Sequence, residues 1–217
     1  KFDRKNYFYP DNPQNYQISQ LYLPICRNGY VEIDAAGRPS GKKRIGIHEI
    51  HMEEDAGKLI HDENEGCTLV DYNRSGVPLI EIVSEPDMRD AEEVIAYLDK
   101  LRLIIRYLGA SDCKLQEGSM RVDVNLSVRP VGEEKLGIRT EMKNLGSFRA
   151  ISRAVEAEKN RQTALLESGK TVIRETRRWD EAGDVSYSMR SKEDIQDYRY
   201  FPDPDLVPVS VTDAWLE

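Results

Sequence analysis

Residues 121–128 read RVDVNLSV, in which polar and apolar side chains alternate without a break. Strict alternation is the pattern of a β-strand with one apolar and one polar face. Residues 137–142 follow a turn-rich connection and predict a second strand, whose polar side carries Glu141 and continues to Lys143. If the apolar sides of both strands share one core, both polar sets lie on the opposite face. The two strands therefore predict a sheet with one chemically rich face.

That face would combine carboxylates with cations and an amide. The residues that it would gather are Arg121, Asp123, Asn125, Arg139, Glu141 and Lys143. Carboxylates can hold Mg²⁺ and cations can hold phosphates, which is the combination that phosphoryl transfer needs. The alternative is the solvated face of a half-buried hairpin, because alternation with water on one side is ordinary. The spacing leaves both interpretations open.

A further strand, predicted over residues 44–52, changes its apolar phase in the middle. Apolar side chains fall at Ile45 and Ile47, and then at Ile50 and Met52. One extra residue between these pairs would explain the change, so we expect a β-bulge there. Bulges are over-represented beside active sites, which draws attention to the end of this strand.

Acidic residues end that strand, within the sequence IHMEEDAGK of residues 50–58. Glu54 could supply another carboxylate to a metal, with Glu53 as its neighbour, and Lys58 a contact to phosphate. The alternative is an acidic turn exposed to water, since runs of charge are usually solvated. Residues 5–11, KNYFYPD, add a second candidate surface, on which Lys5 and Tyr7 could face a base or a ribose. Equally, such aromatic residues can anchor an extended segment on the core.

Two amphipathic helices interrupt the strands. Residues 91–108 repeat apolar side chains every three or four positions, with Asp90 and Glu93 as a capping box and Gly109 as the stop. A second helix follows Ser147 and ends before Gly169. The predicted strands are residues 30–35, 44–52, 77–83, 120–128, 137–142 and 171–179. Several are joined by short loops, so the sequence favours an α+β domain with an antiparallel or mixed sheet over a βαβ repeat.

Composition narrows the class of protein. The 217 residues contain 31 Lys and Arg against 39 Asp and Glu, a net charge of -8, which argues against a protein that coats nucleic acid through a basic surface. Three cysteines without CxxC spacing indicate neither a zinc site nor a disulfide framework, so we expect the reducing cytoplasm. No apolar stretch approaches the roughly 18 residues of a membrane helix, and no secretory signal is visible. We therefore expect no membrane partner.

Eight longer motifs resemble one known family. They are DRKNYFYPD (3–11), YQISQ (16–20), HMEEDAGK (51–58), DYNR (71–74), EIVSEPD (81–87), EGS (117–119), EMKNL (141–145) and DYRYFPDPD (197–205). Together they resemble the GatB subunit of the tRNA-dependent amidotransferase that converts Glu-tRNA(Gln) and Asp-tRNA(Asn) to Gln-tRNA(Gln) and Asn-tRNA(Asn). The resemblance covers nearly the whole chain.

The resemblance implies a cradle domain, with an antiparallel sheet and flanking helices, similar to glutamine synthetase and the guanidino kinases. It implies a cytoplasmic ligase that uses ATP and Mg²⁺ to phosphorylate the side-chain carboxylate of tRNA-bound Glu or Asp. Ammonia from the separate glutaminase subunit then displaces phosphate, and a third, small subunit completes the complex. Phosphorylation is needed because a carboxylate is a poor acceptor for ammonia until it carries a leaving group.

Carried onto this sequence, the resemblance makes Glu54, Asp123 and Glu141 the metal candidates. Arg121, Lys143 and Asn125 would clamp phosphate or the activated carboxyl group. Lys5, Tyr7 and Lys58 would line a nucleotide or tRNA-end pocket. In the resembling family a strand with a Glu-x-His pair precedes this region, and helical and tail domains follow it. We therefore expect residues 1–217 to be a partial cradle (catalytic) domain, or alternatively a non-catalytic fragment for tRNA binding and subunit docking.

Overall fold

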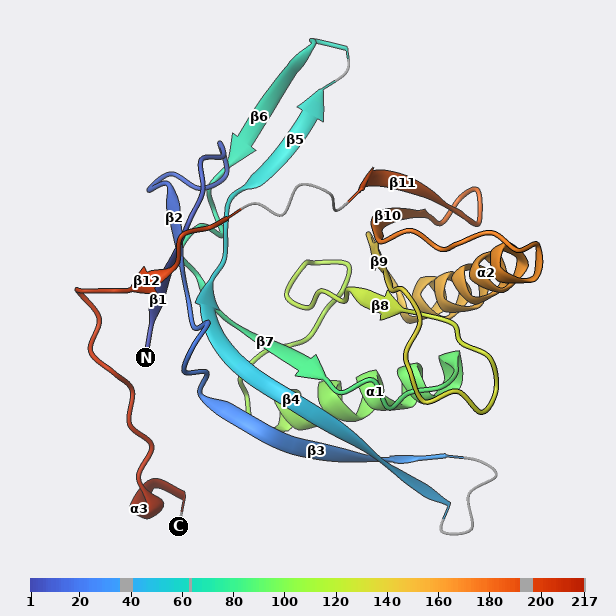
Figure 1. Ribbon diagram of the computed structural model, residues 1–217. Helices are drawn as coiled ribbons and strands as arrows, with labels where there is room; N and C mark the ends of the chain where they lie inside the picture. Colours follow the sequence, from blue (N-terminus) through green and yellow to red (C-terminus); the bar gives the residue numbers. More distant parts are fainter. Residues whose placement is uncertain (36–40, 63, 192–196, 217) are drawn as a thin grey trace. The chain divides into compact units, whose positions relative to one another are not determined.

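The computed structural model describes residues 1–35, 41–62, 64–191 and 197–216 (Figure 1). The chain forms two compact units. Unit 1 comprises Lys1–Tyr30, Gly46–Pro86 and Gln196–Glu217, and unit 2 comprises Val31–Ile45 and Asp87–Ile195. The long strands β3 (Cys26–Asp34) and β4 (Lys42–Glu54) run through residues of both units. Helices and strands are mixed, so the predicted α+β class is confirmed.

Unit 1 is built from short antiparallel pairings. The N-terminal strand β1 (Asp3–Asn6) lies between β2 (Tyr16–Ser19) and β12 (Phe201–Pro202). Strand β7 (Pro78–Ser84) pairs with β4. The remaining elements of the unit are the hairpin β5 (Lys58–Asp62) and β6 (Cys67–Asp71), and the short helix α3 (Asp213–Leu216). Pairing in this unit thus joins chain segments almost 200 residues apart, as in Asp3 opposite Pro202.

The β4–β7 pairing contains the predicted bulge. Ile47 lies opposite Ser84 and Glu49 opposite Val83, so His48 is the extra residue between them. An inserted residue rotates the side chains that follow it by one position. As a result Glu49, His51 and Glu53 come to share one face of the strand.

Unit 2 places two helices and one sheet together. Helix α1 (Ala91–Tyr107) starts at Asp90, whose side chain accepts a hydrogen bond from the amide of Glu93 at 2.8 Å. Gly109 follows its end with φ at +67°, a conformation that glycine adopts without strain. Helix α2 (Phe148–Glu167) is capped by Ser147. Both helices agree with the sequence prediction within one residue.

The sheet of unit 2 has the order β11-β10-β9-β8 (Figure 1). Its strands are β8 (Val124–Leu126), β9 (Thr140–Lys143), β10 (Glu175–Asp180) and β11 (Val185–Ser191). β8–β9 and β10–β11 are antiparallel, but β9–β10 is parallel. The expectation of an antiparallel sheet is therefore wrong for this pair. The reason is that α2 connects β9 to β10, and parallel neighbours require such a crossover.

The core of unit 2 lies between the helices and the sheet. Met142 and Trp179 on the strands and Ile151 on α2 are all fully buried. Helix α1 contributes Leu98 and Leu101, and it packs against α2. The opposite face of the sheet is therefore the one that the polar residues of β8 and β9 can use.

Four predicted elements have shorter or shifted bounds. The strand expected over residues 120–128 is regular only at Val124–Leu126, and that over residues 171–179 begins at Glu175. Ile138, expected in the core, is exposed because β9 begins at Thr140. The sequence did not predict β1, β2, β5, β6, β11 or β12, which are short, and whose pairing depends on distant segments.

Candidate functional site

Strand register confirms that the two predicted polar strands share one face. Val124 lies opposite Met142 and Asn125 opposite Glu141, in an antiparallel pair. Met142 is fully buried, so its neighbour Glu141 points to the other side of the sheet. Asp123 lies two residues before Asn125 and belongs to the same side. The pairing therefore gathers the predicted residues of unit 2 as the alternation indicated.

Lys143 joins the two carboxylates of this face. Its ammonium lies 2.5 Å from Asp123 Oδ2 and 3.4 Å from Glu141 Oε1. Burial alone would lower the pKa of Lys143, but the hydrogen bond and charge of Asp123 and the charge of Glu141 outweigh it and raise the pKa. The position between the carboxylates is thus filled by an ammonium group. A Mg²⁺ ion held by both carboxylates would have to displace it.

The other two predicted residues of this face are more open. Arg121 and Asn125 are both exposed, and Asn125 stands directly opposite Glu141. Neither has to leave the core to reach a ligand. They flank the Lys143 group defined by Asp123, Glu141 and Lys143, which makes an anion the most suitable ligand for this edge of the face.

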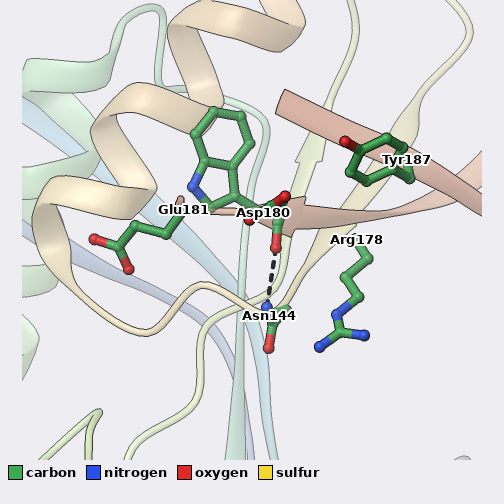
Figure 2. Close-up of a pocket in the computed structure, with 6 residues that line it drawn as sticks. Asn144, Arg178, Asp180, Glu181 and Tyr187 are labelled. Carbon is green, nitrogen blue, oxygen red and sulfur yellow. Dashed lines mark hydrogen bonds between the residues drawn. The ribbon is translucent and has the colours of Figure 1, made fainter. Parts of the chain in front are cut away.

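A cavity of about 300 Å³ opens at the neighbouring strands of the same unit (Figure 2). Its lining residues are Asn144, Arg178, Trp179, Asp180, Glu181 and Tyr187. Asn144, in the left-handed conformation with φ at +66°, donates to the Trp179 carbonyl at 2.9 Å. Arg178 lies opposite Lys143 in the parallel pair and opposite Tyr187 in the antiparallel pair. The cavity therefore borders the polar face, although the sequence predicted none of its lining.

Glu54 lies in unit 1 and is engaged in local contacts. Its Oε1 accepts hydrogen bonds from Gln14 Nε2 at 2.5 Å and from the Ile18 amide at 3.1 Å. Gln17 adds a bond to the Glu54 carbonyl. These contacts hold β2 beside the end of β4. The predicted metal carboxylate thus has a clear structural role in this unit.

The neighbouring residue, Glu53, belongs to a different group on the opposite side of β4. His51 Nε2 lies 3.7 Å from Glu53 Oε2 and 3.4 Å from Glu81 Oε2, and Nδ1 lies 3.3 Å from Glu49 Oε1. One ligand atom each from His51, Glu53 and Glu81 fits within 4.8 Å. The hydrogen bonds from Glu53 and then Glu81 raise the pKa of His51 to about 10, against the effect of burial.

This His51 group, made of His51, Glu49, Glu53 and Glu81, has the donor set of a divalent cation site. Imidazole nitrogen and carboxylate oxygens are common ligands of divalent metals. The same negative field that attracts a proton to His51 would attract a metal ion. Sequence reasoning missed His51 and Glu81 as candidates, because only the register of β4 and β7 places Glu81 opposite His51.

Lys5 and Tyr7 also belong to unit 1 and lie in an aromatic cluster. The Lys5 ammonium is 4.7 Å from the Tyr198 ring centroid and 5.7 Å from that of Tyr7. Tyr7 and Tyr198 meet edge to face. Burial, followed by the charge of Asp11, raises the pKa of Tyr7 to about 12. Tyr7 therefore anchors this segment.

The adjacent Phe8 and Tyr9 are exposed, in contrast to Tyr7. Lys58 begins β5 and stands opposite Asp71 on the β5–β6 hairpin. The candidate residues thus separate by unit: Lys5, Tyr7, Glu54 and Lys58 belong to unit 1, and Arg121, Asp123, Asn125, Glu141 and Lys143 to unit 2. None of the helices in the described part of the chain has the length and apolar character needed to cross a membrane.

Comparison with known proteins extends these observations. The family model of the GatB/GatE catalytic domain matches residues 1–217. The GatB subunit of the aspartyl/glutamyl-tRNA(Asn/Gln) amidotransferase of Agathobacter rectalis is 73% identical over 216 residues, and that of Lachnoclostridium phytofermentans 71% over 216. The same subunit of Caldicellulosiruptor saccharolyticus is 62% identical over 217 residues. In each case the match covers 100% of this chain and 45% of the relative.

The chain spans somewhat less than half the length of the curated relatives it matches. The matched region contains both the His51 group and the Lys143 group, so the charged residues described above fall inside the family's catalytic domain. The chain belongs to the GatB/GatE catalytic domain family.

Proposed function

We propose that this chain is the catalytic part of an ATP-dependent amidotransferase that acts on misacylated Glu-tRNA(Gln) and Asp-tRNA(Asn). The observation that carries the proposal is the family match over every residue, supported by two groups of charged side chains on sheet faces. A carboxylate oxygen of the tRNA-bound side chain attacks the γ-phosphorus of ATP and releases ADP. Ammonia then attacks the activated carbonyl carbon and releases phosphate. The enzyme would work in the cytoplasm.

The Lys143 group is the part best suited to the transferred phosphoryl group. Its ammonium is already oriented by Asp123 and Glu141, so it need not be ordered when the substrate arrives. Arg121 and Asn125 can add contacts to phosphate or to the activated carboxyl group. Catalysis of phosphoryl transfer is mostly positioning and charge neutralisation, and these side chains supply both.

The His51 group fits Mg²⁺ better than the pair Asp123 and Glu141 that the sequence suggested. It offers converging carboxylates of Glu53 and Glu81 with an imidazole, whereas the two carboxylates of unit 2 already share an ammonium. Bound there, Mg²⁺ would neutralise charge on the nucleotide phosphates. Glu54 would support this group indirectly by fixing the end of β4, and Lys5, Tyr7 and Lys58 would contact the nucleotide or the tRNA end.

The partners follow from the chemistry. Ammonia is released safely only beside its acceptor, so a glutaminase subunit is required, together with the small third subunit of the complex and the misacylated tRNA. We further propose that the domain is a cradle related to glutamine synthetase and the guanidino kinases, with its sheets as the substrate surface. The α+β composition of the chain is compatible with that fold.

The test uses the full-length protein assembled with its partner subunits. Glu141→Gln should lower the rate of amidated-tRNA formation by about 100-fold or more, because a charge that organises the transferred phosphoryl group is lost. Glutamine hydrolysis by the partner should largely survive. Glu133→Gln, a change in the exposed turn before β9, is the matched control and should leave the rate unchanged. Normal amidation by Glu141→Gln would refute this role and favour a non-catalytic, tRNA-binding chain.

A further inference from the structure

The carboxylate of Glu141 has a second partner, on the strand beside it. β10 runs parallel to β9 and brings Thr176 opposite Glu141. Thr176 Oγ1 donates a hydrogen bond to Glu141 Oε2 at 2.9 Å. The other oxygen, Oε1, is the one that faces the Lys143 ammonium. The two contacts therefore fix both ends of the carboxylate, one to a neutral donor and one to a charged one.

Thr176 is itself held in place by its neighbours in sequence. It is 2% exposed, and Glu175 and Arg177 on either side point to the opposite face, toward α2. Arg177 Nη1 bonds to Glu175 Oε1 at 2.8 Å. Arg161 of α2 lies 3.4 Å from the same oxygen and makes two bonds to the buried Glu158. These ion pairs attach β10 to the helix at the two residues that flank Thr176.

The same helix also holds the strand that carries Glu141. Gln162 Nε2 donates to Thr140 Oγ1 at 3.3 Å and to the Leu126 carbonyl at 3.1 Å. Its Oε1 accepts from the Val128 amide at 3.1 Å. Thr140 precedes Glu141, and Leu126 lies opposite Thr140. Helix α2 therefore fixes β8, β9 and β10 against one another from the buried side.

We propose that Thr176 is a positioning residue for the proposed reaction, which sets the orientation of Glu141 and through it that of the Lys143 ammonium. This inference rests on the function proposed above for Glu141. The hydroxyl group is suited to the task because it aligns the carboxylate without neutralising it, so the charge stays available to Lys143. A β-branched side chain also has few rotamers, which keeps the donor in one direction. The ion pairs of α2 are the frame that holds the donor at this height of the strand.

The experiment compares two variants of Thr176 in the full-length protein with its partner subunits. Thr176→Val keeps the shape and strand preference but removes the hydroxyl, whereas Thr176→Ser keeps the hydroxyl. Thr176→Val should lower kcat for amidation about 10- to 100-fold, the range for a lost hydrogen bond to a charged group, with KM for ATP changed by about twofold or less. Thr176→Ser should restore kcat to within about threefold of the unchanged protein. A crystal structure of Thr176→Val should show the Glu141 carboxylate rotated away from its present position.

Several outcomes would overturn the inference. Wild-type kcat in Thr176→Val, or equal losses in the Val and Ser variants, would show that the hydroxyl has no positioning role. If Thr176→Val fails to assemble, Thr176→Ser and Thr176→Cys replace it, because both lack the methyl group and only Ser is a strong donor. Equal kcat in that pair would again refute the inference, and a lower kcat for Cys would support it.

Glu141→Gln, measured in parallel, separates the two proposals. An active Glu141→Gln variant would refute the proposed function of Glu141 itself. An inactive Glu141→Gln beside a fully active Thr176→Val would refute only the role of Thr176.

Discussion

The two faces of the β11-β10-β9-β8 sheet carry the same kinds of side chain in opposite environments. Toward α2, Glu158 and Glu175 are 1% and 3% exposed and share the cations Arg161 and Arg177. On the other face the side chains of Lys143 and Asp123 are 39% and 45% exposed.

Buried ions lose their hydration and must be compensated fully, whereas exposed pairs contribute little to stability. The contrast shows that α2 and its ion pairs maintain the sheet, while the exposed charges opposite require a functional explanation.

The largest expected effect comes from breaking the buried network. Glu158→Ala leaves Arg161 and Gln162 without their central acceptor in a buried site, and should lower the free energy of unfolding by about 3–5 kcal/mol. Denaturant unfolding of the full-length protein, followed by the fluorescence of the buried Trp179, measures the change. Glu156→Ala removes an exposed acid of the same helix that pairs with Lys159, and should have an effect below about 1 kcal/mol. Equal effects of the two changes would contradict the contrast between the faces.

A smaller loss is expected for the amide that joins α2 to β8. Gln162→Leu leaves the Val128 N–H and the Leu126 carbonyl without their present partner, and should lower the free energy of unfolding by about 1–3 kcal/mol. Hydrogen exchange gives a local check, because the amide of Val128 should exchange faster. Asn160→Leu, at an exposed position of α2, is the control. An unchanged Val128 exchange rate would show that this bond does not hold the strand.

The buried face should also respond to pH. Burial alone would raise the pKa of Glu175, but hydrogen bonds from Ser188 and Arg177 and the charges of Arg177 and Arg161 outweigh it, and its pKa lies below the ordinary 4.5. The unfolded chain therefore binds a proton at a higher pH than the folded one. The contribution of Glu175 is present above about pH 5 and is lost as the pH falls through its folded-state pKa. Glu175→Gln should flatten the fall in stability between about pH 5 and 3, whereas the exposed Glu167→Gln should not.

The smallest effect on stability, and a large one on activity, is expected on the open face. Asp123→Asn should change the free energy of unfolding by less than about 1 kcal/mol, because its pair with Lys143 is exposed. It should nevertheless reduce amidation by about tenfold or more, since the ammonium loses one of the groups that orient it. Asp184→Asn breaks another exposed pair of unit 2, with Arg153 at 2.8 Å, and should alter neither quantity. Full activity in Asp123→Asn would place the open face outside the reaction.

Helix α2 illustrates how tertiary contacts change the interpretation of a charge pattern. Its sequence presents a basic side, which leaves docking to the glutaminase subunit, tRNA phosphate contact and a solvated face open. In the structure Arg153 pairs with Asp184, Lys159 with Glu156, and Arg161 with Glu158. Arg149 is exposed. Most of the basic side is therefore compensated within unit 2, which favours internal cohesion as its main role.

The sequence by itself determined the features that depend on neighbours along the chain. Periodicity and capping residues located α1 and α2, the shift of apolar phase located the bulge at His48, and alternation identified the polar face of Asp123 and Glu141. These signals are local because backbone hydrogen bonds within a helix, and the two faces of a strand, repeat over a few residues. The motifs that carry the family resemblance are equally local.

Only the tertiary structure decided which charged groups meet. The pairing of β4 with β7 sets Glu81 beside His51, and the crossover through α2 sets Thr176 beside Glu141. The same crossover buries Glu158 and Glu175 between cations that lie in different elements. No periodic pattern encodes these encounters, because they depend on strand order and register, which are fixed by the packing of segments far apart in the chain.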